Sequence, residues 1–229
     1  MGLLIIGNSV SLKSSEDAST YPKILEQNLG GEFNVIEVIR AGNTVCDLET
    51  DAIISLDKFS PRIMILQIGH VDCAPRPLKR WERDVLSKVR PNWLRNQIIH
   101  FIHNYRPELI RLRGLIQFTP LLLFEQSVKL IVNRANLENA FIFILPITRV
   151  AAQQERREPW YNREIERYNS ALRTFSSRQV MYIEQEQLLG DLTPEEYCLT
   201  PEDLHLKDFA HERIADYLEI AIRRNLKVN

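Results

Sequence analysis

The sequence has few cysteines and no long apolar segment. Its 229 residues contain three cysteines, Cys46, Cys73 and Cys198. Three scattered cysteines are too few for a disulfide framework, and no CxxC pair indicates a zinc site. The apolar runs are far shorter than the ~20 residues that a membrane helix needs. We therefore expect reduced thiols, no membrane span, and neither a metal nor an organic cofactor.

The sequence also lacks a strong net charge. A formal net charge of −1 gives no overall attraction to nucleic acid or to anionic lipid, and no nucleic-acid-binding module is recognisable. The first apolar run begins at Leu3, which leaves no space before it for a secretory signal peptide. We expect a cytoplasmic protein, and the apolar fraction of 45% is sufficient for a substantial core.

Five short runs rich in Ile, Val, Leu and Phe predict β-strands. They are Leu3–Ile6, Asn34–Ile39, Ile63–Ile68, Ala140–Leu145 and Val180–Ile183. The first, third and fourth show no polar alternation, which is typical of strands covered on both faces.

Helical patterns lie between these strands. Apolar residues recur at helical spacing in Ser19–Leu29, which ends at a Gly-Gly pair, and in Arg163–Phe175. Residues from Asp208 to Arg224 predict a terminal helix. Alternating strands and helices indicate parallel pairing with right-handed crossovers. We therefore predict a three-layer α/β/α sandwich with a flavodoxin-like, five-stranded parallel sheet.

One connection is much longer than a crossover helix requires. Some seventy residues, from Gly69 to Asn139, separate the third and fourth strands. The helical patterns within it are Trp81–Val89, Trp93–Asn104, Pro107–Leu112 and Leu121–Val132. We expect one domain spanning 1–229, with a helical insertion at about 76–135.

The insertion is basic. Residues from Arg76 to Arg113 include ten Lys or Arg and three acids, although the whole chain is nearly neutral. A solvated helical face is the usual explanation of such a charge run. The functional alternative is a basic lid that attracts an anionic substrate, with Trp81 and Trp93 available to stack on a sugar or a base.

Ser9 and His205 are the candidate catalytic residues. Ser9 directly follows the first predicted strand, at the edge of the sheet where active sites of α/β proteins lie. A serine hydroxyl needs a base, an acid that orients the base, and N–H donors for the oxyanion. His205 supplies the base, and Glu202 or Asp203 the acid. The backbone amides of Ser9 and Gly42 are the expected oxyanion donors.

Four short blocks together resemble the SGNH (GDSL-like) hydrolase superfamily. They are Gly7-Asn8-Ser9, Gly42, Gly69-His70-Val71-Asp72 and Glu202-Asp203-Leu204-His205. The resemblance implies a serine hydrolase that cleaves an ester through an acyl-enzyme, with Glu202 at the position of the triad acid and Asp203 as the alternative. The segment from Val71 to Arg76 is also similar to a subgroup with functions in bacterial surface polysaccharides.

Three positions depart from the family pattern. Glu202 stands where the family has the triad aspartate. Asn8 replaces the aspartate before the nucleophile, and Val71 replaces the asparagine that donates to the oxyanion. His70 or Asn43 is the expected substitute donor. Asp72 is interpreted as a residue that caps the insertion or holds loop backbone rather than as a catalytic acid.

Other functions remain open at this stage. The substrate that the resemblance implies is a small ester, either of a carbohydrate or of another small polar molecule. The same acyl-enzyme serves an acyltransferase equally well. A catalytically degraded binding protein, or an interaction module that works through the basic insertion, is the alternative from another class.

Overall fold

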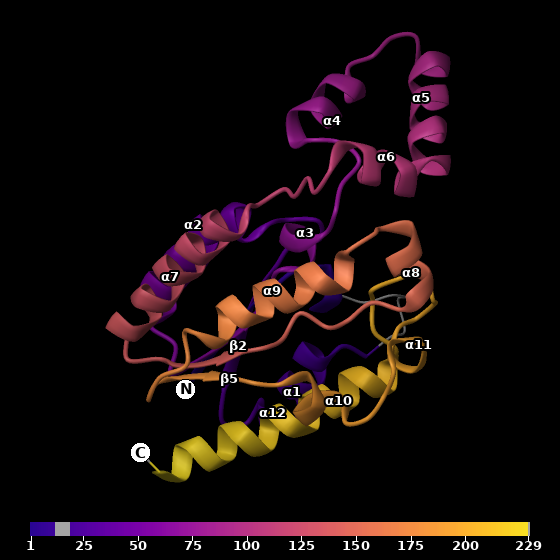
Figure 1. Cartoon of the computed structure of the whole chain (residues 1–229). Coiled ribbons are helices and arrows are strands. Elements are labelled where there is room, and N and C mark those ends of the chain that lie inside the picture. Colours follow the sequence, from indigo (N-terminus) through magenta and orange to yellow (C-terminus); the bar gives the residue numbers. More distant parts are fainter. Residues whose placement is uncertain (12–18, 229) are drawn as a thin grey trace.

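The computed structural model describes residues 1–11 and 19–228 (Figure 1). Its five strands form one parallel sheet in the order β2-β1-β3-β4-β5, which is the flavodoxin-like order. The strands are β1 (Gly2–Gly7), β2 (Asn34–Ile39), β3 (Ile63–Gln67), β4 (Phe141–Ile144) and β5 (Val180–Tyr182). The predicted five-stranded parallel sheet is thereby confirmed.

Alternating side chains of β1 build two separate cores. Leu4 and Ile6 point to one face of the sheet and Leu3 and Ile5 to the other, and all four are fully buried. Because both faces of the strand are buried, its sequence is a continuous run of apolar residues.

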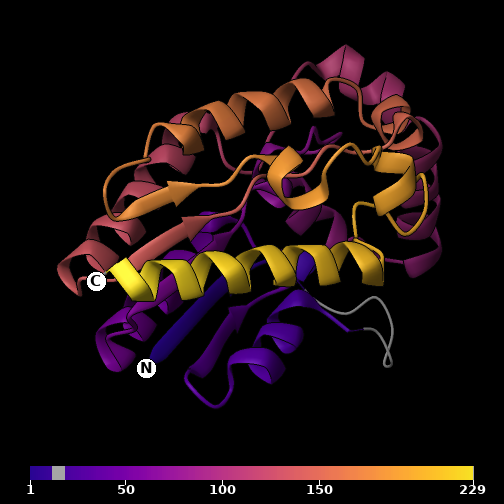
Figure 2. The same ribbon diagram turned by 90° about the horizontal axis from the view of Figure 1, so that it is seen from below.

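Helices cover both faces of the sheet, as the predicted sandwich requires. The core containing Leu4 and Ile6 lies under α2 (Val45–Phe59), α7 (Leu121–Leu137) and α9 (Tyr161–Arg173). The core containing Leu3 and Ile5 lies under α1 (Tyr21–Leu29), α10 (Gln185–Leu189) and α12 (Asp208–Val228). Figure 2 shows α12 and α1 side by side on this second face. Each core is therefore closed by its own helical layer.

Short helices follow the carboxyl ends of the strands. The 3-10 helix η1 (Ser9–Ser11) follows β1, and α3 (His70–Cys73) follows β3. Two others, α8 (Ala152–Arg157) and α11 (Pro194–Tyr197), lie in the connections after β4 and β5. These elements place most of the candidate site residues at one edge of the sheet.

Three helices project from this edge in Figure 1: α4 (Arg80–Ser87), α5 (Asn92–Asn104) and α6 (Arg106–Arg113). They contain one fully buried residue, Ile110. Arg106 of α6 forms a part-buried ion pair with Glu158 at the end of α8, which joins the projection to the body of the molecule.

The helix α7 differs from these three helices. Its buried residues include Phe124, Val128 and Ile131, and it packs against α2 in the layer over the sheet. No helix in the described ranges is long and apolar enough to span a membrane.

Candidate active site

Ser9 lies at the carboxyl end of β1, where the strand passes into η1. The turn is held by its own backbone and by Asn8, whose Oδ1 accepts a hydrogen bond from Val10 N at 3.3 Å, while Asn8 O accepts from Ser11 N at 3.0 Å. Asn8 is buried and Ser9 is half-buried. The arrangement leaves the Ser9 side chain at the edge of the sheet rather than in its core.

Ser11 fixes this turn against the neighbouring strand. Its hydroxyl is hydrogen-bonded to Gln67 Oε1 at the end of β3 and lies 3.2 Å from the hydroxyl of Tyr21. All three side chains are buried. Sequence reasoning did not identify Ser11 or Gln67, because the link between them depends on the parallel register that pairs Gly7 with Gln67.

His205 forms a close pair with Asp203. His205 Nδ1 lies 2.5 Å from Asp203 Oδ1, and the His205 backbone N–H donates to the same oxygen at 3.0 Å. Burial opposes ionisation of Asp203, but these hydrogen bonds and the His205 charge hold its pKa below the usual value. The pairing leaves Nε2 as the ring nitrogen available for proton transfer.

The loop that carries this pair is held by backbone hydrogen bonds. Leu199 N donates to His205 O at 2.8 Å, and Lys207 N donates to Tyr197 O at 2.9 Å, around an antiparallel bridge between Cys198 and Leu206. Buried Leu206 anchors the loop in the core beneath α12. The imidazole is therefore positioned by a short two-stranded turn rather than by a free loop.

Glu202 forms no hydrogen bond or ion pair with the imidazole in the described part of the chain. Its side chain is exposed and accepts a hydrogen bond from Gln153 of α8. Spacing alone places Glu202 first and Asp203 second as the orienting acid, whereas the structure brings Asp203 to the ring.

The loop after β2 contains Gly42 in a left-handed conformation, with φ of +73°. An L-side chain rarely adopts this conformation, so glycine is favoured here. Arg40 N donates to Gly7 O at 3.1 Å and so brings the start of the loop beside the end of β1. Asn43 is half-buried, and in the described part of the chain its side chain has no hydrogen-bond partner.

Asp72 ties this loop to the third block. Its Oδ1 accepts a hydrogen bond from Val45 N at 2.9 Å, at the start of α2. This contact is the backbone-holding role predicted for Asp72. Burial raises the pKa of the carboxyl group to about 6, although the hydrogen bond from Val45 favours ionisation.

Gly69 begins the third block at φ of +116°, and a Cβ there would overlap the side chain of Ile147. Both the conformation and the close approach of Ile147 require glycine. The following residues form α3, in which Val71 is 9% exposed and offers no side-chain donor.

Both ring nitrogens of His70 are engaged inside the protein. Nδ1 lies 3.3 Å from the Tyr161 hydroxyl and Nε2 lies 3.1 Å from Thr148 Oγ1. Because the Tyr161 hydroxyl donates to His70 O at 3.0 Å, its oxygen accepts from Nδ1–H and leaves Nε2 to accept from Thr148. Burial, helped by the charge of His205, lowers the pKa of His70 to about 3. The ring is therefore neutral, with no donor free to face a substrate.

The charge of His205 also lowers the pKa of His211, as it does that of His70. His70 and His211 therefore both lie within electrostatic range of His205. His211 stacks on Tyr21, which is linked through Ser11 to the Ser9 turn. In the described part of the chain, no hydrogen bond joins Ser9 to His205. Catalytic hydrogen bonds are often long in unliganded enzymes and tighten when substrate binds.

We expect His211 to make the protein less stable in acid. Burial lowers its pKa to about 4, against an ordinary value of 6.5, although nearby Asp208 acts in the opposite direction. The unfolded chain therefore binds a proton on this ring below about pH 6.5 that the folded chain does not, and stability falls as the pH decreases from 6.5 toward 4.

The control is His211→Phe, which keeps a ring against Tyr21 and removes the titration. Urea unfolding at pH 7 and at pH 4.5 should show that wild type loses on the order of 2 kcal/mol more than the variant. Equal losses in the two proteins would contradict this assignment.

Within residues 1–11 and 19–228, no group of three or more His, Cys, Asp or Glu side chains is placed to hold a metal ion. At this edge of the sheet the described residues offer a hydroxyl, an imidazole paired with a carboxylate, and backbone amides.

No protein-family model and no curated protein matches the sequence. Solved structures match over nearly the full length. A lipase/acylhydrolase from Enterococcus faecalis has a TM-score of 0.67 at 10% identity, covering 98% of this chain and 96% of that chain. TesA has a TM-score of 0.63 at 15% identity, and the match covers 98% of this chain and 99% of that chain. The acetylxylan esterase Axe2 from Geobacillus stearothermophilus has a TM-score of 0.61 at 15% identity, and the match covers 95% of this chain and 91% of that chain. At these identities the likeness concerns the backbone, and the protein has the α/β/α fold of these esterases and acylhydrolases.

Proposed function

We propose that this protein is a serine esterase of the SGNH type, with Ser9 as the nucleophile, His205 as the base and Asp203 as the acid that orients it. The observation that carries the proposal is the 2.5 Å contact between His205 Nδ1 and Asp203 Oδ1. It provides an oriented imidazole on the loop before α12, while Ser9 begins η1 just beyond the carboxyl end of β1. No other described serine has both features of Ser9, a partly exposed side chain and a position at the carboxyl end of a strand.

The reaction follows from these roles. Ser9 Oγ attacks the ester carbonyl while His205 Nε2 takes its proton, and Asp203 stabilises the imidazolium that forms. The imidazolium then returns the proton to the departing alcohol, which leaves an acyl group on Ser9. A water molecule, activated by the same imidazole, hydrolyses this acyl-enzyme and regenerates the serine. Transfer to a second alcohol instead of water describes the acyltransferase alternative.

The proposed oxyanion hole uses the backbone amides of Ser9 and Gly42. The Asn43 side chain is the available third donor, because the ring donor of His70 is committed to Tyr161. We assign His70 a positioning role: its bonds to Tyr161 and Thr148 hold the turn that begins at Gly69.

The similar structures support hydrolysis of an ester. One is a lipase/acylhydrolase and another is an acetylxylan esterase, and mutants described as catalytic in the latter replace a serine and a histidine. An ester of a carbohydrate or of another small polar molecule is the substrate class that we propose. The similarity of the Val71–Arg76 segment to a surface-polysaccharide subgroup favours the carbohydrate.

A binding protein without activity is the competing proposal. It is favoured by Val71, which removes a donor that typically contributes 10²–10³-fold in rate. Steady-state hydrolysis of p-nitrophenyl acetate by the purified protein tests the two proposals. Turnover well above buffer supports the esterase, and a folded protein without turnover supports the binding protein.

We expect Val71→Asn to raise kcat on p-nitrophenyl acetate, with ~10²-fold as the upper bound and little change in KM. The added amide donates mainly to the tetrahedral intermediate, so it acts on the transition state. Val71→Ala is the matched control, since it shortens the side chain without adding a donor. If Val71→Asn is no faster than Val71→Ala, the hole does not depend on the two backbone amides alone, and the role of third donor goes to Asn43.

A further inference from the structure

A cavity of about 340 Å³ lies within the projecting helices, at their junction with the body of the molecule. Its walls come from α4, α5 and α6 and from the segments before α4 and after α6. The residues that line it are Arg76, Pro77, Leu78, Arg83, Leu86, Ile99, Ile102, Arg106 and Phe118. The volume falls within the range of small-molecule sites.

The charged part of the wall consists of three arginines. Arg106 is paired with Glu158, whereas Arg76 and Arg83 form no ion pair with any described residue. Three guanidinium groups against one carboxylate leave an excess of two positive charges around the cavity. The Nε atoms of Arg76 and Arg106 are buried without a hydrogen-bond partner in the described part of the chain. Because these two atoms have almost no accessible surface, it is the excess positive charge on the wall that indicates an anionic ligand.

The remaining wall is apolar and aromatic. The guanidinium carbons of Arg76 and Arg83 lie 4.8 and 5.1 Å from the centre of the Phe118 ring. Leu86, Ile99 and Ile102 complete this side of the cavity. A ligand that fits has an anionic end for the guanidinium groups and a small apolar body for these side chains.

Hydrogen bonds between the elements that surround the cavity hold its frame together. Arg113 of α6 forms a bidentate ion pair with Glu82 of α4, at 2.7 and 2.8 Å, and also donates to Pro77 O. Arg76 N donates to Ile116 O at 2.8 Å, which joins the segment before α4 to the segment after α6. The arginines of the cavity are therefore presented by a fixed frame.

We propose that this cavity binds a phosphate monoester whose alcohol part is small and apolar. A phosphate monoester carries a charge of about −1.5 to −2 at pH 7, which matches the excess of two positive charges better than a single carboxylate does. Planar guanidinium groups bind phosphate oxygens through two parallel hydrogen bonds. The proposal does not rest on esterase activity, because binding is measured without turnover.

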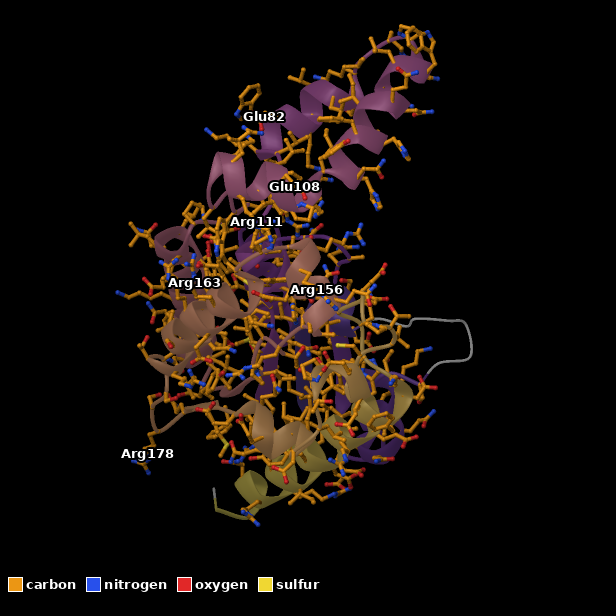
Figure 3. All side chains as sticks on the ribbon, turned by 45° about the vertical axis from the view of Figure 1, so that its right-hand side comes forward. Glu82, Glu108, Arg111, Arg156, Arg163 and Arg178 are labelled. Atoms are coloured by element: carbon orange, nitrogen blue, oxygen red, sulfur yellow. The ribbon has the colours of Figure 1, made fainter. Side chains whose placement is uncertain are left out.

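Isothermal titration of the full chain with phenyl phosphate at low salt tests the proposal. We expect saturable binding by wild type and at least tenfold weaker binding by Arg83→Ala, since a charged hydrogen bond contributes about that factor. Arg111→Ala is the matched control, because Arg111 is an exposed cation on α6 that does not line the cavity (Figure 3). We expect it to bind within about twofold of wild type. Thermal melting of each variant confirms that it is folded.

Further probes separate the two parts of the site. Leu86→Trp keeps every charge and fills the apolar side, so it should also weaken phenyl phosphate binding. Inorganic phosphate should bind more weakly than phenyl phosphate, and phenol should not bind. Absence of binding by wild type at millimolar concentration overturns the proposal, as do equal losses in Arg83→Ala and Arg111→Ala. Tighter binding of benzoate than of phenyl phosphate overturns the assignment of a phosphate.

Discussion

Replacement of Ser9 by alanine is expected to abolish ester hydrolysis, with a loss of about 10⁴–10⁶-fold in kcat on p-nitrophenyl acetate. The Ser9 hydroxyl is the proposed nucleophile, so its loss leaves only the oxyanion amides and substrate binding. The melting temperature should hardly change, because the side chain is half-buried and forms no hydrogen bond in the described part of the chain.

Ser11→Ala is the matched control for this variant. Its hydroxyl lies two positions away and is bonded to Gln67 and Tyr21 inside the protein. Removal of this hydroxyl should lower stability by about 1–3 kcal/mol, because it leaves buried partners unsatisfied, while much of the turnover is kept. If Ser9→Ala keeps wild-type activity, Ser9 is not the nucleophile.

Asp203→Asn is expected to lower kcat by about 10⁴-fold, because an amide neither stabilises the imidazolium nor selects the correct tautomer of His205. Asp203 Oδ1 accepts from both the ring and the backbone N–H of His205, so the variant weakens the orientation of the base. Measurement of kcat and kcat/KM on one aryl ester gives the size of the effect.

Glu202→Gln is the control for the neighbouring carboxylate. Glu202 is exposed and bonded to Gln153 on α8, so its replacement should change kcat by less than about tenfold. A larger loss in Glu202→Gln than in Asp203→Asn would return the role of the acid to Glu202.

The order of these two acids shows what spacing leaves undetermined. Family spacing ranks Glu202 first, since it is three residues before the histidine. In the folded loop, the short side chain of Asp203 bonds the backbone N–H two residues ahead, as aspartate commonly does in turns. That local bond also places its carboxylate on the imidazole. Spacing along the chain carries no information about such a turn.

The sheet was predictable because strands buried on both faces are continuous apolar runs. The helix α2 was not predicted, although Thr44 and Asp47 form a capping box and Leu48, Ala52 and Leu56 follow at helical spacing. Four polar or charged residues among its first seven weaken the apolar pattern. The helix is stabilised instead by the packing of its apolar face against the sheet and α7, which the sequence pattern does not show.

The limits of sequence reasoning are clearest in the projecting helices. Their positions follow from periodicity, and their basic character from composition. The cavity cannot be predicted from the sequence. Arg76, Arg83 and Arg106 come together only because the ion pair between Arg113 and Glu82 joins α6 to α4. Likewise, α7 reads as one more helix of the long connection, yet its buried face places it in the layer over the sheet.

Covalent labelling with a fluorophosphonate tests the central claim most directly, because the reagent reacts with a serine hydroxyl only when that hydroxyl is activated as a nucleophile. Intact mass measurement followed by peptide mapping should show one adduct per chain, located on Ser9. The adduct should be absent in Ser9→Ala and should form much more slowly in Asp203→Asn. A folded wild-type protein that stays unlabelled, or that is labelled at another residue, would contradict the account.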